Sequence, residues 1–219
     1  MHKVEEVPVG YDVLAVNSAI ARRNRELLDS RGITAFNVMG AIGSGKTILI
    51  ELAIQRLGNK YRIGTLAGDV VARIDAARFE RHGVPTVGLN TGKECHLDAH
   101  LVEHGLSKLP LDKLDMVFIE NVGNLICPAD YALGEHRRVV VVSVSEGDDI
   151  VEKHPVIFSA ADLVIVNKID IAEAVGADAD KMVADARTIN PKLEVLKTSA
   201  KTGDGIGKWI EFVERGRRG

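Results

Sequence analysis

The stretch Gly40-Ala-Ile-Gly-Ser-Gly-Lys-Thr47 fits the pattern G-x-x-x-x-G-K-[ST], which forms a phosphate-binding loop, or P-loop, when it joins a strand to a helix. An expected strand at residues 34–39 precedes it, and residues 47–57, which follow, have the pattern of a helix. In this setting the glycines allow consecutive backbone N–H groups to point at phosphate oxygens, and the helix N-terminus adds to the attraction. The stretch therefore predicts a loop that binds nucleotide phosphates.

Two residues of the loop have expected roles in catalysis as well as in binding. Lys46 can reach the β- and γ-phosphates, and the Thr47 hydroxyl can bind Mg²⁺. The expected phosphate and Mg²⁺ contacts of the loop are Gly40, Gly43, Ser44, Gly45, Lys46 and Thr47.

On either side of the loop, apolar runs alternate with stretches of helical pattern. The expected strands are residues 34–39, 63–67, 86–89, 116–120, 139–144, 163–166 and 193–196. Most of these runs are continuous, which suits strands covered on both faces. Expected helices include residues 47–57, 74–82 and 94–109. The alternation predicts an α/β fold of the P-loop NTPase type, with three α/β/α layers and a mainly parallel sheet of about seven strands sandwiched by helices.

Ahead of the first strand, residues 13–28 have the pattern of an amphipathic helix with a basic face at Arg22, Arg23 and Arg25. We therefore expect residues 1–33 to form an N-terminal helical extension and residues 34–219 to form the P-loop domain. The extension is expected to pack or to form an interface rather than to act in catalysis.

A second motif, Asn167-Lys168-Ile169-Asp170, follows the expected strand at residues 163–166 and indicates guanine. The Asp170 carboxylate can accept from both N1–H and the exocyclic amine of guanine, whereas adenine would place an acceptor against it. Asn167 and Lys168 complete the expected base contacts. Ser199, Ala200 and Lys201 follow the last expected strand, where GTPases place a backbone N–H near the guanine oxygen. GTP and GDP are therefore the expected nucleotides.

Two further segments are expected to form the nucleotide switch. Glu120 and Gly123 end the strand at residues 116–120; Gly123 stands where a GTPase senses the γ-phosphate, and Glu120 replaces the more usual aspartate. Asp69 and Asp75 follow another strand, and either could help to hold Mg²⁺ through water. The residue after Gly123 is not the glutamine that orients the attacking water in Ras-like enzymes, so slow intrinsic hydrolysis is expected.

The only two cysteines, Cys95 and Cys127, indicate a metal site. His96 adjoins the first cysteine, and His100 and His104 follow at intervals of one helical turn, so a helix would place all three histidines in one stripe. Cys127 comes four residues after Gly123, which would connect metal affinity with the nucleotide state. Thiolate and imidazole suit both Zn²⁺ and Ni²⁺.

The set Cys95, His96 and Cys127 is one ligand short of a closed tetrahedral site. Water, His100 or His104, or ligands from a second chain could complete it, and a two-fold dimer would bring four thiolates together. A structural zinc site without metal transfer and a redox thiol pair are the alternatives.

Residues 91–98, 120–128 and 146–155 resemble the HypB family, the nickel-insertion GTPases of [NiFe]-hydrogenase maturation. The resemblance extends over residues 35–209. It implies a GTPase of the class in which GTP promotes a homodimer, with metal ligands that match Cys95, His96 and Cys127. It also implies that Lys153 takes part in nucleotide-dependent dimer contacts.

Many bacterial members of that family carry an N-terminal cysteine motif or a histidine-rich tail, whereas here His2 is the one candidate ligand ahead of the P-loop. Nickel storage is therefore not expected. A separate nickel-binding maturation partner is implied, together with the large-subunit precursor of the hydrogenase as acceptor.

Charge and hydropathy exclude other classes of partner. The net charge is −3 and no long basic block is present, so nucleic acid is not an expected partner. The most apolar run, residues 139–144, is too short to cross a bilayer, and no signal-peptide pattern is present, so a cytoplasmic location is expected. A urease-type nickel GTPase is one alternative, although its Cys-Pro-His motif would require histidine where Ala129 stands. A regulatory GTPase with structural zinc is the other.

Overall fold

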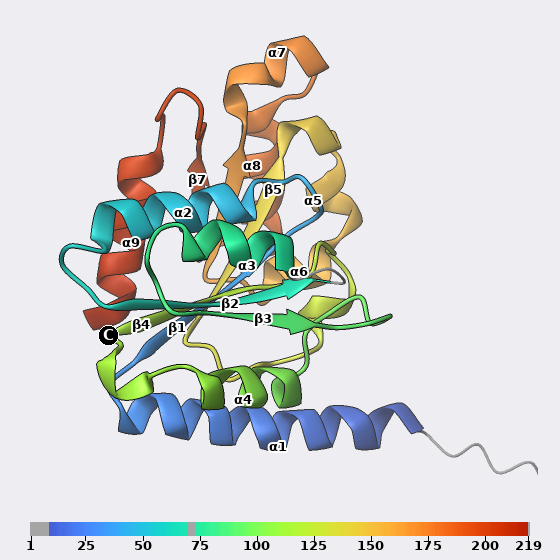
Figure 1. Cartoon of the computed structure of the whole chain (residues 1–219). Helices are drawn as coiled ribbons and strands as arrows, with labels where there is room; N and C mark the ends of the chain where they lie inside the picture. The colour runs from blue at the N-terminus through green and yellow to red at the C-terminus, as the bar shows by residue number, and fades with distance from the viewer. Residues whose placement is uncertain (1–8, 70–72, 219) are drawn as a thin grey trace, which may run out of the picture.

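A computed structural model describes residues 9–69 and 73–218 and shows a parallel sheet between two layers of helices (Figure 1). The seven strands have the order β3-β2-β4-β1-β5-β6-β7, and every neighbouring pair is parallel. Their bounds are β1 Thr34–Met39, β2 Ile63–Asp69, β3 Thr86–Asn90, β4 Met116–Glu120, β5 Arg137–Ser143, β6 Leu163–Asn167 and β7 Glu194–Lys197. The predicted three-layer α/β fold is confirmed.

Each face of the sheet has its own helices because the strands are buried on both sides and their side chains alternate between the faces. One face packs against α2 (Lys46–Leu57), α3 (Arg73–Glu80) and α9 (Ile206–Arg218). The other face packs against α1 (Val9–Ser30) and α4 (Ala99–Lys108) at one end and against α6 (Pro155–Ser159) and α8 (Ala179–Ile189) at the other. Figure 1 shows α2 and α3 above the sheet and α1 beside α4 below it.

Short helices connect the main elements. They are the α-helices α5 (Ile150–Lys153) and α7 (Ala172–Val175) and the 3₁₀ turns η1 (Leu111–Lys113), η2 (Cys127–Ala129), η3 (Val144–Glu146) and η4 (Ile169–Ile171). No helix within residues 9–69 and 73–218 is long and apolar enough to span a membrane.

The expected helix at residues 94–109 is wrong in its first turn. Helix α4 begins at Ala99, because the Asp98 side chain accepts a 2.7 Å hydrogen bond from the backbone N–H of Leu101 and so caps the helix. Cys95 and His96 therefore lie in a loop. The other expected elements are present, with ends that differ by up to four residues; α1, for example, runs from Val9 to Ser30 rather than over residues 13–28.

Two buried asparagines attach α1 to the start of α4. Asn17 Oδ1 accepts a hydrogen bond from Ala99 N, and Asn24 Nδ2 donates one to Ala99 O, both at 2.8 Å. Of the expected basic face, Arg23 pairs with Glu103 on α4. The helix thus holds the polypeptide just after the loop of Cys95 and His96. The division into an extension at residues 1–33 and a domain at residues 34–219 stays a prediction.

Trp209 fixes the helix that follows the P-loop. Its side chain is fully buried, its Nε1 donates a 2.9 Å hydrogen bond to the backbone oxygen of Leu49 on α2, and its ring packs near Phe118 and Phe212. Because a large cavity would form, Trp209→Ala should lower the free energy of unfolding by about 3–5 kcal/mol. Trp209→Phe keeps most of the volume and should cost about 1–2 kcal/mol, chiefly through the lost donor. Urea unfolding followed by circular dichroism measures both, and a loss below about 1 kcal/mol for the alanine variant would contradict this packing.

Candidate functional site

The P-loop adopts a backbone that only glycine tolerates at several positions. Gly40, Gly43 and Gly45 have φ angles of 145°, 80° and 106°. A Cβ on Gly45 would lie 2.2 Å from the Asn167 amide nitrogen, and one on Gly40 would lie 2.1 Å from the oxygen of Val141. The glycines of the motif are therefore required by the turn and by close packing against β5 and the end of β6.

The ammonium group of Lys46 folds back over the loop. Its Nζ donates hydrogen bonds of 2.9 and 3.1 Å to the carbonyl oxygens of Gly40 and Ala41. Burial lowers the pKa of Lys46, and the charge of Glu120 acts in the opposite direction. A buried cation held only by neutral carbonyls suits the arrival of phosphate oxygens, which would bind it more strongly.

A cleft of about 300 Å³ opens beside the P-loop. It is lined by Ile42, Gly43, Gly45, Lys46, Thr47, Ile48, Gly68, Asp69, Asp75, Arg78, Glu120, Asn121 and Gly123. Apart from Gly40 and Ser44, the sequence-predicted residues of the phosphate and Mg²⁺ site thus come together from four segments near the carboxyl ends of the strands, the expected place for a ligand in a parallel sheet.

Glu120 and Thr47, which both line this cleft, contact each other. The Thr47 hydroxyl donates a 2.6 Å hydrogen bond to Glu120 Oε1, while the buried Glu120 Oε2 has no hydrogen-bond partner. Burial raises the pKa of Glu120 to about 7, with the Thr47 bond and the Lys46 charge opposing the rise. Burial and the charge of Asp69 raise the pKa of Asp75 as well. These oxygen donors fit Mg²⁺, which would stabilise the charged carboxylates.

Gly123 packs directly on the P-loop. A Cβ there would lie 2.2 Å from the Ile42 side chain and 3.0 Å from Ile42 N. This close approach brings the end of the segment after β4 to the phosphate loop, as the switch prediction requires.

The guanine motif is held in place by hydrogen bonds between loops. Asn167 Nδ2 donates to Ser44 O at 2.9 Å, and its Oδ1 accepts from the Thr198 hydroxyl at 3.0 Å. Asn167 therefore ties the P-loop to the two loops that are predicted to bind the base, a role that the sequence prediction did not include. Lys168 is the one non-glycine residue with positive φ among the described residues, at 61°.

Asp170 and the segment at Ser199, Ala200 and Lys201 also lie together. The Ser199 hydroxyl donates a 2.6 Å hydrogen bond to Asp170 Oδ1, and Asp170 is exposed. The chain turns back at Gly205, where a Cβ would lie 2.0 Å from the oxygen of Lys197.

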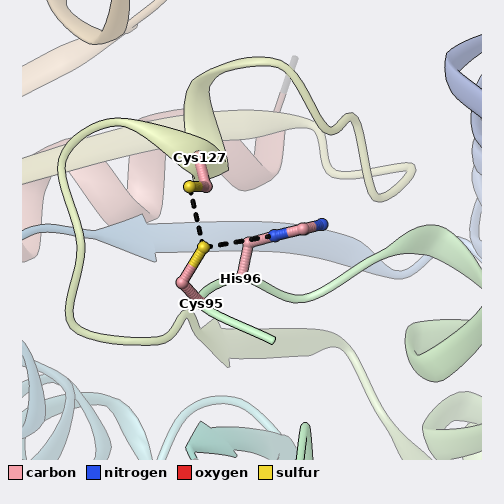
Figure 2. A group of neighbouring side chains, drawn as sticks. All are labelled: Cys95, His96 and Cys127. Atoms are coloured by element: carbon pink, nitrogen blue, oxygen red, sulfur yellow. Dashed lines mark hydrogen bonds between the residues drawn. The ribbon is translucent and has the colours of Figure 1, made fainter. Parts of the chain in front are cut away.

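The predicted metal ligands converge from the loop before α4 and from the start of η2 (Figure 2). Cys95 Sγ lies 2.7 Å from Cys127 Sγ and 3.8 Å from His96 Nδ1, and both thiols are free. One ligand atom from each of the three residues lies within 4.8 Å of the others. The hydrogen bond with Cys127 raises the pKa of the Cys95 thiol. The ring of Tyr131 packs 3.8 Å from the ring of His96 and fixes its orientation.

His100 and His104 are not part of this cluster in the described chain. The predicted stripe of three histidines is wrong because α4 begins after His96, so that His96 does not share a helix with the other two. His100 instead lies 3.7 Å from a carboxylate oxygen of Glu103. His2 lies outside the described residues.

Two asparagines that sequence reasoning missed connect the cleft with the metal loop. Asn124 pairs its backbone with Gly40 of the P-loop, and its Nδ2 donates a 3.2 Å hydrogen bond to Cys95 O. Asn121 is buried, and its Oδ1 accepts from Leu97 N at 3.1 Å. One feature of the sequence could have indicated both residues, because asparagine in a loop after a strand commonly forms hydrogen bonds with backbone groups.

Two charged residues were missed as well. Arg78 lines the nucleotide cleft, and its spacing of three from Asp75 on α3 could have indicated a shared face. Burial raises the pKa of Glu146, whose Oε1 accepts a hydrogen bond from Ser143 N at 2.9 Å.

The geometry can be compared with known proteins. Residues 34–197 match the family model described as the CobW/HypB/UreG nucleotide-binding domain. The chain is 57% identical to the probable hydrogenase maturation factor HypB of Methanocaldococcus jannaschii over 215 residues, 98% of this chain and 97% of that protein. It is 41% identical to hydrogenase maturation factor HypB of Escherichia coli K12 over 209 residues, 95% of this chain and 72% of that one.

Solved structures agree with these relatives. HypB from Archaeoglobus fulgidus matches with a TM-score of 0.87 and 54% identity, covering 92% of this chain and 98% of that chain. HypB from Helicobacter pylori in complex with nickel matches with a TM-score of 0.87 and 32% identity, covering 92% and 95%. The signal recognition particle receptor FtsY from Elizabethkingia anophelis, at a TM-score of 0.57 and 19% identity over 92% of this chain and 72% of that one, shares the fold alone. The resemblance inferred from the sequence is confirmed, and the chain belongs to the CobW/HypB/UreG family as one of its HypB hydrogenase maturation factors.

Proposed function

We propose that the chain hydrolyses GTP to GDP and phosphate and uses this cycle to gate the transfer of nickel into a [NiFe]-hydrogenase. The observation that carries the proposal is the position of Asn124, whose backbone pairs with Gly40 and whose side chain holds the carbonyl of Cys95. One residue thus joins the phosphate loop to the loop that carries two of the three metal ligands. Nickel is the cargo in this scheme, and GTP sets its affinity.

Hydrolysis depends first on the P-loop. Phosphate oxygens would replace the Gly40 and Ala41 carbonyls on the Lys46 ammonium, whose positive charge then stabilises the charge that develops on the phosphates. Thr47 and Glu120 would hold Mg²⁺, which when bound supplies further positive charge to the β- and γ-phosphates. Asn124 stands after Gly123 with its side chain bonded to Cys95 O and Ile126 N, so it is not placed to orient water and hydrolysis is slow.

Recognition of guanine rests on Asp170. The Ser199 hydroxyl donates a hydrogen bond to one carboxylate oxygen of Asp170 and so fixes the plane of the carboxylate. The exposed face remains for N1–H and the exocyclic amine, and Ser199-Ala200-Lys201 supplies backbone N–H groups beside the base. Asn167 holds these loops at a fixed distance from the P-loop.

Metal binding is proposed to move the switch segment. Two thiolates on one tetrahedral ion lie about 3.8 Å apart, from a metal–sulfur distance of about 2.3 Å. The Cys95 and Cys127 sulfurs are 2.7 Å apart, so an arriving Ni²⁺ or Zn²⁺ would separate them by about 1 Å. Cys127 begins η2, four residues after Gly123, and the displacement therefore acts on the nucleotide side.

A second copy of the chain is proposed to complete the site when GTP is bound. Three ligands leave a tetrahedral ion one short, and a two-fold partner would add further thiolates. Ile42, Ile74 and Ile126 are 85%, 66% and 65% exposed and lie on segments of the nucleotide and metal sites, where a dimer would bury them. Lys153, which pairs with Asp149 in the free chain, is proposed to join these contacts.

The proposed partners and location are those that membership of the family suggests. A nickel-binding maturation protein would load the site, and the hydrogenase large-subunit precursor would accept the metal, in the cytoplasm. A urease-type nickel GTPase is the alternative that Ala129 argues against. A regulatory GTPase with structural zinc is the alternative that the third experiment below tests.

The first experiment concerns base recognition. Asp170→Asn should exchange a preference for GTP for one for XTP, because an amide N–H would meet the 2-oxo group of xanthine but repel the 2-amino group of guanine. The amide oxygen can still accept from Ser199, so the loop should keep its shape. Competition binding of GTP and XTP measures the preference. A variant that still prefers GTP by about tenfold, or about 1.4 kcal/mol, would contradict the assignment.

The second experiment concerns catalysis. Lys46→Ala removes the positive charge of the loop and should lower GTP turnover by about 10²–10³-fold, as loss of a transition-state donor does. Phosphate release at saturating GTP is the readout, and the thermal melt of the variant shows whether the fold is intact. Turnover equal to that of the unmodified chain would remove Lys46 from the mechanism.

The third experiment tests coupling between the two sites. Replacing GDP by a non-hydrolysable GTP analogue should change the affinity for Ni²⁺ or Zn²⁺ by about 5- to 150-fold, and the metal should shift analogue affinity by the same factor. Asn124→Ala keeps all three ligands but removes the bond to Cys95 O, so it should reduce the coupling factor. Asn59→Ala, at an exposed turn after α2, is the matched control and should leave it unchanged.

Metal titration calorimetry, at a concentration where light scattering gives the same oligomeric state for both nucleotides, supplies the affinities. Identical metal affinity with GDP and with the analogue would show that the site is a structural zinc site and that the gating proposal is wrong.

A further inference from the structure

Arg78 has no part in the mechanism described so far, yet its side chain lines the nucleotide cleft. It comes from α3, one turn after Asp75, and both residues face the same space as Glu120. Asp75 and Glu120 both interact electrostatically with the Arg78 guanidinium. Among the described residues that line this cleft, Lys46 and Arg78 are the cations.

The carboxylate of Glu51 holds the Arg78 guanidinium in a fixed plane. Nε of Arg78 donates to Glu51 Oε1 at 3.3 Å, and Nη2 donates to Glu51 Oε2. Glu51 is itself 7% exposed and lies on α2, one turn after Thr47. A two-point contact of this kind restricts both the position and the orientation of an arginine.

The contact leaves donors unused. A guanidinium carries about five N–H groups, and Glu51 engages one on each of two nitrogens. The remaining N–H groups can therefore bind anionic oxygen while the ion pair with Glu51 persists. Arginine is suited to this double use because its planar fork keeps its charge at any pH of interest.

The balance of charge in the cleft favours the binding of anionic oxygen by Arg78. Three carboxylates, those of Asp69, Asp75 and Glu120, line the same cleft. They suit Mg²⁺ but would repel phosphate oxygens, and Lys46 is the one other cationic side chain among the described residues of the lining. Arg78, a second fixed cation in the lining, offsets this repulsion.

We propose that Arg78, positioned by Glu51, is a catalytic residue whose guanidinium binds the phosphates of GTP and stabilises the charge that develops during hydrolysis. The proposal rests on the GTP hydrolysis proposed above. Water attacks the γ-phosphorus, the bond from this phosphorus to the bridging β–γ oxygen breaks, and GDP and inorganic phosphate form. The water proton passes to phosphate oxygen, while Arg78 exchanges no proton and acts through its charge and N–H groups.

The test compares Arg78→Ala with His82→Ala. His82 is a matched control because its Nε2 lies 3.4 Å from Glu51 Oε1 and it follows α3 directly, but it does not line the cleft. Arg78→Ala should lower kcat for GTP by about 10²–10³-fold, with KM and GDP affinity within a few-fold of the unmodified chain. His82→Ala should keep kcat within about threefold. Single-turnover phosphate release with Mg²⁺ present gives the rates.

Two further measurements separate a chemical role from a structural one. Guanidinium ion added at millimolar concentration should restore part of the activity of Arg78→Ala, whereas ethylammonium at the same concentration should restore less. Arg78→Lys keeps the charge but loses the two-point contact with Glu51, so it should fall between the alanine variant and the unmodified chain and provides the comparison if the alanine variant folds poorly. Glu51→Gln should lower kcat about tenfold without changing GDP affinity.

The outcomes distinguish this inference from the function on which it rests. If the unmodified chain releases phosphate, but Arg78→Ala and His82→Ala lose equal activity or guanidinium gives no rescue, Arg78 only fixes α3 and the inference fails. Activity of Arg78→Ala and Arg78→Lys equal to that of the unmodified chain overturns it too. If the unmodified chain binds GTP but releases no phosphate, the proposed hydrolysis itself fails, and the role of Arg78 falls with it.

Discussion

The amide of Asn167 donates a 2.9 Å hydrogen bond to the carbonyl of Ser44, and this contact holds the phosphate loop against the strand that ends in the guanine motif. It is possible only because Gly45, with φ at 106°, leaves no Cβ to meet that amide. The loop in turn fixes Lys46 and Thr47 at the start of α2, and Trp209 fixes α2 from behind through Leu49. The phosphate loop, the predicted guanine motif and α2 are therefore held together by one close approach of two chain segments.

The nucleotide cleft contains a buried acidic group, Glu120, that the packing of the fold does not require. Glu120 is 4% exposed, has one oxygen without a partner, and has a pKa raised to about 7 by burial. Such a group costs stability in the free chain, because its charged form is desolvated. Mg²⁺ bound at Glu120, as proposed, would offset this cost, so the same carboxylate that destabilises the free chain would strengthen binding of the metal ion and nucleotide.

The sequence was sufficient for features that depend on local pattern. Chemistry restricts the residues of the P-loop and the pair Cys95 and Cys127 to few uses. The apolar runs of the sequence likewise indicated the strands. The helical pattern that begins at residue 94 was misleading, because Asp98 caps the helix by accepting from Leu101 N, and the helix begins at Ala99, five residues later than periodicity suggests. Arg78 and Asn124 were missed because their roles depend on which distant segments adjoin them, and a single sequence does not report such distances.

The hydrogen bonds between α1 and Ala99 limit how the chain can be divided into shorter pieces that still fold. Asn17 and Asn24 bind the N–H and the carbonyl of the same peptide residue, and Leu28 of α1 is fully buried in the core beside α4. Removing α1 would take away these two hydrogen bonds, three residues from His96, at a cost of about 0.5–1.5 kcal/mol for each. The smallest piece that retains an ordered metal loop is therefore larger than the nucleotide-binding sheet, and the first helix is part of it.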